Sequence, residues 1–395
     1  MASKSLVLVV NPGSASRKYA LFADGIKRAN VHFEFEDGRI IGSIECDEQK
    51  QLKIYEDTDL SIVSRYVMPL LHEYKIINDD ENITTIGIRL VAPSMRFTQD
   101  ELVADDVEAA LELLQQKAPL HITTVLSEIK HLKDFFPNIP IIAVSDTAFH
   151  VTKRECAWYY GIDTKFADES GIKRYGYHGV SVGSVVHCLE DQSRLSPKTI
   201  ICHIGSGSSV TAVQNGKSVD TTMGYSPLEG LVMSSRSGTM DVSAALAIKR
   251  ELRLDDDGLE QYLNKKSGLL GISGSSNDIR QLIISEEAGD KRAKLALDIF
   301  VYRLQLAIGQ MAASMNGVDC LVFTATVGER SSIIRGRILD GLSYLGFNYD
   351  VKANESTFEP TESTNISLKA SKTILVISTD ESSEIARRAE QFIIQ

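Results

Sequence analysis

The sequence lacks the patterns that mark several common classes of protein. Its five cysteines are scattered, odd in number and never spaced as CxxC, which argues against a disulfide framework or a zinc site. No block of lysine or arginine interrupts the net charge of −11, so neither a nucleic-acid surface nor attachment to an anionic membrane is expected. The N-terminal apolar run is too short to span a membrane or to act as a signal peptide. These absences predict a cytoplasmic protein with reduced thiols, whose functional cations are single residues.

Two common nucleotide-binding motifs are missing from the segments that read as functional loops. The loop-like segments 277–280 and 326–330 match neither GxGxxG nor GxxxxGK[ST]. Nucleotide binding of the Rossmann or Walker type therefore finds no support there.

The length and the order of the elements indicate two α/β domains. A chain of 395 residues, 43% hydrophobic and 24% charged, is ordinary for a soluble protein but too long for one simple core. Antiparallel strands open the chain, and alternating helices and strands then complete a mixed α/β domain that ends near residue 150. The pattern starts again at residue 199. The second half is predicted to contain a long helix at about 286–316, buried strands at 320–328 and 373–378, and an amphipathic helix at 384–395.

A polar turn between apolar strands occurs twice, at 11–18 and at 205–209. Glycine permits a tight turn, and a run of serine and glycine leaves N–H groups and hydroxyls to face an anion. In the first turn Asn11, Ser14, Ser16 and Lys18 could converge on one phosphate, although such residues also form plain hairpins and lysine is often only solvated. The repetition favours two related domains that hold one phosphate-bearing ligand between them.

Two charged residues at strand ends are candidates for the chemistry. Arg89 ends an otherwise apolar strand, where a charge is costly unless it is paired or functional, and its guanidinium suits two-point recognition of a carboxylate or phosphate. Asp146 follows the apolar run 140–144 and could hold Mg²⁺ through oxygen or water ligands, or it could cap a helix.

Two further candidates lie in polar segments. His178 stands between Tyr177 and Gly179, and a lone histidine is more often structural than catalytic. Arg236 is surrounded by small polar residues and is predicted to be exposed at a turn. The alternative for each arginine is an ordinary ion pair, and Arg89 is the stronger functional candidate.

Taken together, these segments resemble the acetate kinases, within the superfamily of acetate and sugar kinases, Hsp70 and actin. The resemblance runs almost end to end and includes NPGSASRK, SDTAFH, YGYHGVS, SRSGTMD and VFTATVGERS, with the most specific stretch from Cys202 to Arg280. It implies an α/β fold of two related ribonuclease H-like domains of the actin/Hsp70 type, with the active site in an interdomain cleft. The implied domains are an acid- and phosphate-binding domain at 1–149 and a nucleotide-binding domain at 150–381, with a helix at about 382–395 packing back on the first.

The resemblance also implies roles for individual residues. Asn11 and Glu381 would help to hold Mg²⁺, or Mn²⁺ in its place, and Arg89 would bind the substrate carboxylate or the transferred phosphoryl group. Asp146 would act through the metal or as an acid/base, while His178 and Arg236 would stabilise the transition state. An apolar pocket for the methyl group would be lined by Val91, Leu120, Tyr177 and Pro227. The phosphates and adenosine of ATP would be bound by Lys18, His203, Ile204, Gly205, Ser206, Gly207, Asp278, Ile279, Arg280, Thr326, Val327, Gly328, Glu329 and Arg330.

The implied reaction is ATP + acetate = ADP + acetyl phosphate, reversible and Mg-dependent, by direct in-line transfer. A carboxylate is already ionised, so the reaction requires positioned cations more than a strong base. A propionate or other short-chain acyl kinase, a kinase with another phosphoryl donor such as pyrophosphate, and a catalytically idle nucleotide-binding protein stay open. The family also implies a homodimer, with small-molecule substrates and neither nucleic acid nor a membrane as partner.

Departures from the family pattern lie near the implied site. The usual His-Gly-Gly after the strand of Arg89 is replaced by residues 92–94, and the usual Asn of the second turn is Ser206. The nucleotide segment 325–330 carries larger side chains and an added charge, and a pocket position that is commonly Phe is Tyr177. All the charged catalytic positions are kept, which favours a working kinase and leaves the acyl-chain and nucleotide preferences open.

Overall fold

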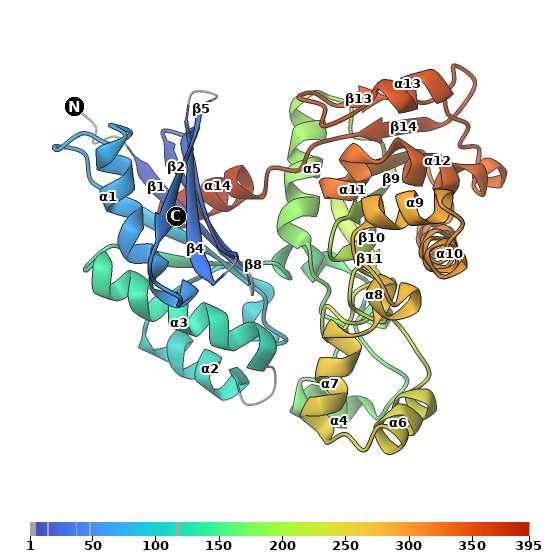
Figure 1. Ribbon diagram of the computed structural model, residues 1–395, viewed down its shortest axis with the longest axis horizontal. Coiled ribbons are helices and arrows are strands. Elements are labelled where there is room, and N and C mark those ends of the chain that lie inside the picture. Colours follow the sequence, from blue (N-terminus) through green and yellow to red (C-terminus); the bar gives the residue numbers. More distant parts are fainter. Residues whose placement is uncertain (1–4, 14–15, 37, 47–48, 116–118, 395) are drawn as a thin grey trace. The chain divides into compact units, whose positions relative to one another are not determined.

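The computed structural model describes residues 5–13, 16–36, 38–46, 49–115 and 119–394 (Figure 1). Ser14 of the first polar turn lies outside the described residues. The chain forms two compact units: unit 1 comprises Met1–Ala148 with Asp380–Gln395, and unit 2 comprises Phe149–Thr379. Unit 1 is therefore built from two segments that are far apart in the sequence.

Unit 1 is built on an eight-stranded mixed sheet, in the order β5-β4-β3-β2-β1-β6-β8-β7. Strands β1 to β5 are successive antiparallel neighbours, β1, β6 and β8 run parallel, and β7 is antiparallel to β8. The strands are β1 (Leu6–Pro12), β2 (Ser16–Ala23), β3 (Ile26–Glu36), β4 (Arg39–Cys46), β5 (Gln49–Tyr55), β6 (Thr85–Leu90), β7 (Glu101–Leu102) and β8 (Ile141–Ser145).

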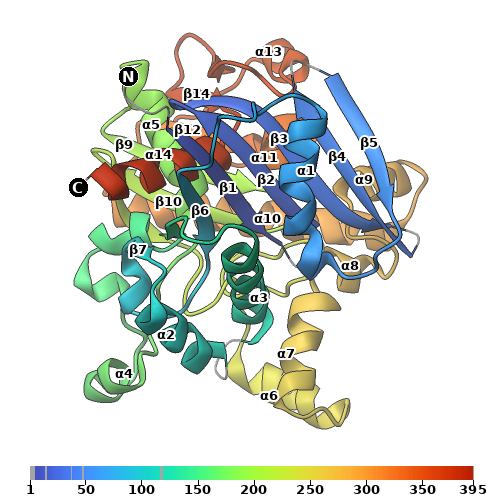
Figure 2. The ribbon, with the colours of Figure 1, turned by 90° about the vertical axis from the view of Figure 1, so that its left-hand side faces the viewer.

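Helices cover both faces of this sheet. Figure 2 shows α1 (Val67–Glu73) and α3 (Pro119–Phe135) in front of the strands, with α2 (Asp105–Gln115) beside α3. Their apolar faces form one core with alternate residues of the strands, such as Leu8, Val10 and Ile88. On the other face, α14 (Glu381–Ile394) packs against β1, β6 and β8. A Cβ added at Gly87 of β6 would lie 2.9 Å from Ile385 Cγ2, so the missing side chain of Gly87 is what lets this helix approach.

Unit 2 contains a six-stranded sheet in the order β11-β10-β9-β12-β14-β13. Strands β9, β10 and β11 are antiparallel neighbours, β9, β12 and β14 run parallel, and β13 is antiparallel to β14. The strands are β9 (Lys198–Ile204), β10 (Ser208–Gln214), β11 (Lys217–Thr221), β12 (Cys320–Thr324), β13 (Thr364–Asn365) and β14 (Thr373–Val376).

Both faces of the unit 2 sheet are also covered by helices. Alternate residues of β9 explain this, because Ile200 and Cys202 join one core with α10 (Lys291–Ser314) while Ile201 joins another with Val182 of α5 (Gly179–Asp191). The helices are α4 (Thr164–Ser170), α5 (Gly179–Asp191), α6 (Val242–Glu251), α7 (Asp256–Lys265), α8 (Gly268–Ser273), α9 (Ile279–Glu287), α10 (Lys291–Ser314), α11 (Ala325–Arg330), α12 (Ser332–Asp340) and α13 (Val351–Ser356).

The two sheets repeat one topology. The order β3-β2-β1-β6-β8-β7 in unit 1 corresponds strand for strand to β11-β10-β9-β12-β14-β13 in unit 2, with the same parallel and antiparallel neighbours. Each polar turn predicted from the sequence connects the first two strands of its unit. The prediction of two related α/β domains of the ribonuclease H-like type is confirmed by this correspondence.

Two predictions of secondary structure are wrong. The long helix predicted at about 286–316 is two helices, because Gly289 has a φ of +94° and Asp290 caps a new helix by accepting hydrogen bonds from the N–H groups of Arg292 and Ala293. The strand predicted at 320–328 ends at Thr324, and the segment after it turns at Ala325 (φ +65°) into the short helix α11.

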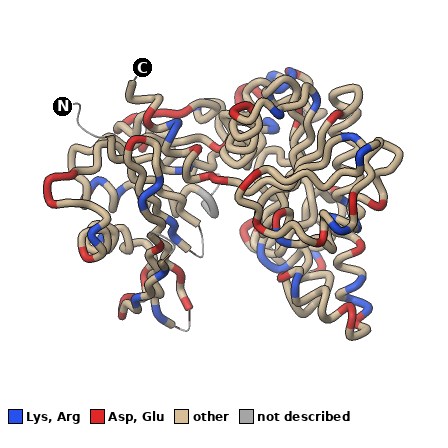
Figure 3. The backbone as a smooth tube through the Cα atoms, turned by 90° about the horizontal axis from the view of Figure 1, so that it is seen from above, with Lys and Arg blue, Asp and Glu red and all other residues tan. Residues whose placement is uncertain are grey.

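Helix α10 is long and apolar enough to cross a membrane by length and composition alone. Its buried residues, among them Phe300, Leu304 and Ile308, form the core of unit 2, so the core explains its apolar character. Figure 3 shows that Lys and Arg are interspersed with Asp and Glu in the described parts of both units.

Candidate active site

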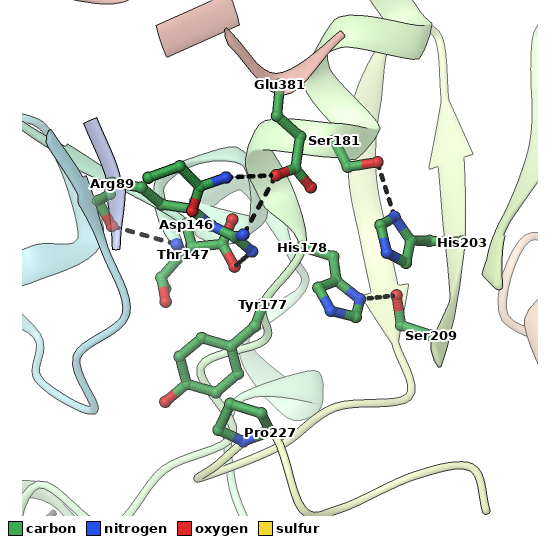
Figure 4. Close-up of polar contacts among 12 residues, drawn as sticks. Arg89, Asp146, Thr147, Tyr177, His178, Ser181, His203, Ser209, Pro227 and Glu381 are labelled. Carbon is green, nitrogen blue, oxygen red and sulfur yellow. Dashed lines mark hydrogen bonds and ion pairs between the residues drawn. The ribbon is translucent and has the colours of Figure 1, made fainter. Parts of the chain in front are cut away.

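In unit 1, Arg89 lies between two carboxylates. Its Nη2 donates to Oδ2 of Asp146 at 2.9 Å and its Nη1 to Oε2 of Glu381 at 3.2 Å (Figure 4). The three residues meet because β6 and β8 are parallel neighbours whose carboxyl ends lie at one edge, and Glu381 is the first residue of α14. Burial, the largest single effect, lowers the pKa of Arg89, but the two carboxylates more than offset it and the pKa rises above its ordinary value.

One donor of the Arg89 guanidinium, its Nε–H, makes no hydrogen bond within the part of the chain that the structure describes. This Nε–H is also buried. A buried donor without a partner is costly, on the order of 1–3 kcal/mol, and is rare in folded proteins. Such a donor beside two paired N–H groups is suited to an anionic oxygen of a ligand.

The residues predicted to hold a divalent metal adjoin this arginine. Asn11, near the end of β1, donates from Nδ2 to Oε2 of Glu381 at 3.0 Å. Among the described residues, no group of three or more His, Cys, Asp and Glu side chains could hold a metal ion by itself. Mg²⁺ commonly uses one or two carboxylates and completes its shell with water and phosphate oxygens, so the carboxylates of Glu381 and Asp146 are a fitting donor set.

In unit 2, two histidines are stacked and held by serines. The ring centroids of His178 and His203 lie 4.0 Å apart, with an angle of 27° between the ring planes (Figure 4). Nδ1 of His178 is hydrogen-bonded to Ser209 Oγ at 3.0 Å, and Nδ1 of His203 to Ser181 Oγ at 2.7 Å. His178 is the residue just before α5 and has a φ of +61°, while His203 lies in β9. The left-handed backbone at a non-glycine residue is uncommon, and it is often found at functional positions.

The side chains of an arginine and a histidine converge on the polar turn of unit 2. A Cβ added at Gly207 would lie 3.3 Å from Arg236 Nη1 and 3.3 Å from His178 Nε2, so both side chains lie close against this glycine. The turn is closed by Gly205 N–H donating to the carbonyl of Gly207 at 3.0 Å. Arg236 was predicted to be exposed at a turn, but it is half-buried, with Nη1 3.5 Å from the carbonyl oxygen of Pro227. A glycine turn with a guanidinium and an imidazole beside it can bind a phosphate.

The residues predicted to line an acyl pocket lie in both units. Tyr177 is buried and its hydroxyl donates to the carbonyl of Tyr225, two residues before Pro227. In unit 1, Val91 is half-buried directly after β6. Leu120 lies in the first turn of α3, and its side chain is outside the described part of the structure.

His150 is a site residue that sequence reasoning missed. It is fully buried, with Nδ1 2.9 Å from Ser218 Oγ and Nε2 3.0 Å from the carbonyl oxygen of Tyr177. Since a carbonyl only accepts, Nε2 carries the proton and Nδ1 accepts from the Ser218 hydroxyl. His150 thus fixes the backbone just before His178. Its place in SDTAFH was the only available signal.

The predicted phosphate and nucleotide residues of the two units differ in their surroundings. Lys18 of unit 1 is exposed on β2. In unit 2, His203 and Ile204 end β9, and Gly205, Ser206 and Gly207 form the turn that follows.

The other nucleotide segments, which were predicted to be loops, begin or form helices. Asp278 caps α9 by accepting from the N–H of Arg280 at 2.8 Å, and it also pairs with the exposed Arg280 side chain at 2.6 Å. Ile279 is buried in the first turn of the same helix. Residues Thr326, Val327, Gly328, Glu329 and Arg330 belong to α11.

A buried arginine holds the end of α11. The Arg335 side chain is fully buried, and its Nη1 donates at 2.9 Å to the carbonyl oxygens of both Gly328 and Glu329. Oε1 of Glu329 accepts from the N–H of Thr379 at 3.1 Å, and burial raises the pKa of this carboxyl group. Arg330, whose added charge set the sequence apart, pairs with Glu359.

Comparison with known proteins identifies relatives along nearly the whole chain. A model of the acetokinase family matches residues 6–387. An acetate kinase from Bacillus cytotoxicus is 38% identical over 392 residues, covering 97% of this chain and 98% of the relative. Among solved structures, a propionate kinase from Francisella tularensis has a TM-score of 0.89 at 33% identity, covering 98% of this chain and 99% of that one. An acetate kinase from Porphyromonas gingivalis has a TM-score of 0.87 at 32% identity, covering 98% and 100%.

Proposed function

Because the chain belongs to the acetokinase family, we propose that it transfers the γ-phosphoryl group of ATP to acetate, reversibly, giving acetyl phosphate and ADP. The observation that carries the proposal is Arg89, a buried guanidinium with an unpartnered Nε–H beside two carboxylates. Such a group suits an anionic acceptor that has no proton to lose. A carboxylate oxygen attacks the γ-phosphorus, the new O–P bond forms, and the bond from phosphorus to the β,γ-bridging oxygen breaks with its electrons leaving on ADP.

Arg89 binds the acid or the transferred phosphoryl group in this proposal. Its two Nη groups are held by Asp146 and Glu381, so the guanidinium is oriented before the ligand arrives. Orientation in advance lowers the cost of bringing two anions together. Mg²⁺, which would neutralise charge on the phosphates, would be held by Glu381, with Asp146 and Asn11 beside it.

The residues of unit 2 supply the remaining positive charge. His178 Nε2 and Arg236 Nη1 both adjoin Gly207, where we place the phosphoryl oxygens in the transition state. Removing one such donor typically costs on the order of 3 kcal/mol of transition-state stabilisation. The turn 203–207, the segments 278–280 and 326–330, and Lys18 are assigned to ATP, and Val91, Leu120, Tyr177 and Pro227 to the methyl group.

The test is acyl-phosphate formation from ATP and Mg²⁺ with acetate, propionate and butyrate, trapped with hydroxylamine. Acetate should give the highest kcat/KM. Propionate is the second candidate because a propionate kinase is among the similar structures, and one methylene in an apolar pocket discriminates by only about 1–3 kcal/mol. Activity with pyrophosphate but not with ATP would show that pyrophosphate is the phosphoryl donor. Binding of ATP without turnover of any acid would contradict the proposal.

We also propose that the enzyme works as a cytoplasmic homodimer. The supporting observations are its family, its free cysteines and its acidic balance. Light scattering of the purified protein should give twice the mass of the 43.5 kDa chain, and a monomer at working concentration would contradict the proposal.

A further inference from the structure

We propose that Arg388 and Asp100 are positioning residues that fix Asp146 through the backbone of Ser145. The proposal rests on the function proposed above, in which Asp146 and Arg89 act together. Neither Arg388 nor Asp100 belongs to the predicted site.

The two side chains hold both polar groups of the Ser145 backbone. Oδ1 of Asp100 accepts from the Ser145 N–H at 2.9 Å, and Nη2 of Arg388 donates to the Ser145 carbonyl oxygen at 2.9 Å. Arg388 and Asp100 also pair with each other, with Nε to Oδ2 at 2.9 Å. Their side chains are only 11% and 17% exposed, so water screens this pair poorly. The peptide that leads into Asp146 is therefore held by a charged pair from one side.

The pair of Asp100 and Arg388, which we call the Ser145 clamp, takes the place of a missing strand partner. Strand β7 pairs only two residues, Glu101 with Ala143 and Leu102 with Ile142, and it does not extend to Ser145. Asp100 directly precedes β7 and bonds Ser145 with its side chain instead. On the other side, β6 continues the ladder, since the Asp146 N–H donates to the carbonyl of Leu90 at 2.9 Å. The Ser145 hydroxyl also donates to the carbonyl of Phe97, so the backbone N–H and carbonyl of Ser145 are the groups that depend on Asp100 and Arg388.

One stripe of α14 connects the clamp to the site. Glu381, Ile385 and Arg388 are spaced four and three residues apart, which places them on one face of the helix. Glu381 bonds Arg89, Ile385 lies against Gly87, and Arg388 bonds Ser145. Gly87 and Arg89 are two residues apart on β6 and so share one face of the sheet. The helix therefore contacts β6 beside Arg89 and the end of β8 just before Asp146.

A cavity beside the clamp makes a sharp test possible. It has a volume of about 590 Å³ and is lined by Arg388, Asp100 and Arg96, among others. Arg96 is a matched control, because it lines the same cavity and pairs with Glu101 and Asp106 without contacting Ser145. The experiment compares R388A with R96A, each with and without added guanidinium ion at concentrations that leave the protein folded. D100N provides a second variant.

We expect R388A to lower kcat by about tenfold to a hundredfold with the KM for ATP nearly unchanged, because a small displacement of catalytic groups has effects of that size. Guanidinium should restore much of this loss, while R96A should need no rescue. Equal kcat in R388A and R96A, or a loss in R388A and D100N that follows only their lower melting temperature and is not rescued, would overturn the proposal.

A second readout does not depend on the reaction. Hydrogen exchange of the peptide 141–148 should become faster in R388A than in the wild type or R96A, while peptides from β1 and β2 stay unchanged. This result would support the clamp even if the wild type proved inactive with acetate, in which case the proposed function alone would fail. Unchanged exchange at 141–148 would overturn the clamp whatever the activity.

Discussion

The hydroxyl of Tyr177 donates a hydrogen bond of 2.6 Å to the backbone carbonyl of Tyr225. This bond ties the residue before His178 to the segment that carries Pro227, so the two unit 2 residues assigned to the acyl pocket are held to each other. A phenylalanine at this position could not make this bond.

Tyr177→Phe should therefore loosen the Pro227 segment and relax the selection against longer acids. We expect the ratio of kcat/KM for propionate to that for acetate to rise several-fold, within the limit of about 1–3 kcal/mol for one methylene. The variant should lose about 1 kcal/mol of unfolding free energy. Tyr175→Phe is the matched control, because Tyr175 is equally buried and donates to the carbonyl of Gly171 but lies outside the proposed pocket. The same change of ratio in both variants would contradict the assignment.

Arg89→Ala should abolish most activity and should also lower the unfolding free energy, by about 3–5 kcal/mol, because Asp146 would stay buried without the cation that pairs with it. The variant removes the donor assigned to the acid, and a loss of about a hundredfold to a thousandfold in kcat/KM is expected for one such group. Steady-state kinetics and urea unfolding measure the two effects. Arg28→Ala is the control, since Arg28 is also an arginine of unit 1 but pairs with Glu81 away from the site. Near-normal turnover in Arg89→Ala would remove the role that we assign to Arg89.

Arg17 and Lys18 are neighbours in β2, but substitution of Arg17 should lower stability whereas substitution of Lys18 should change only the kinetics with ATP. Arg17 is buried against Glu128, whose carboxylate also accepts from the Tyr19 hydroxyl. Nη1 of Arg17 donates to the carbonyl of Ser16 at 3.2 Å. Arg17→Met would leave Glu128 buried without its cation, which should cost about 3–5 kcal/mol of unfolding free energy.

Lys18→Met should leave stability unchanged and raise the KM for ATP, because Lys18 is exposed and assigned to phosphate. Urea unfolding and kinetics of the two variants measure the contrast. Equal stability of both variants would contradict the stabilising role that we assign to the Arg17–Glu128 pair.

Lys153 should make the unfolding free energy vary with pH between about 7 and 10.5. Burial lowers its pKa from 10.5 to about 7, more than the carboxylates of Asp220 and Glu229 can raise it. Between these two pH values the unfolded chain keeps the proton that the folded chain has lost, so the unfolding free energy rises with pH across this window. The full effect is roughly 3–5 kcal/mol, at about 1.4 kcal/mol per pKa unit.

Lys153→Met should flatten that rise when urea unfolding is measured at several pH values across the window. Lys173→Met is the control, because Lys173 pairs with Asp168 and its pKa is raised rather than lowered. Parallel stability curves for wild type and Lys153→Met would contradict the prediction.

The repeated topology and the charged site residues could be predicted from the sequence, because both depend on local patterns. The polar turns marked the first hairpin of each unit, and Arg89 was conspicuous as a charge in an apolar strand. The break at Gly289–Asp290 also has a local signal, a glycine followed by a capping residue, which the apolar periodicity outweighed. The helix after Thr324 has none, since it depends on Ala325 adopting a left-handed backbone and on Arg335 holding the end.

Side-chain pairs between distant segments could not be predicted. Arg388 and Ser145 are 243 residues apart, and His150 and Ser218 are 68 apart. Nothing in the local pattern of either residue indicates its partner, because the partner is fixed only by how the sheets and helices pack. The exposure of Arg236 was predicted wrongly for the same reason: the residues next to it in the sequence do not indicate that its guanidinium lies beside Gly207 and the carbonyl of Pro227 in the fold.

Unit 1 cannot be completed early during synthesis of the chain, because its strands come from residues 6–145 whereas Glu381 belongs to α14. Arg89 and Glu381 are 292 residues apart. At about 5–20 residues per second, a ribosome would need roughly 15–60 s to make the chain between them. Through that interval the nascent sheet has Gly87 uncovered and Arg89 without one of its two carboxylates. The pairing of Arg89 with Glu381 is thus completed only after α14 has been made, and a chain released before that point would carry nearly all of the sheet without Glu381.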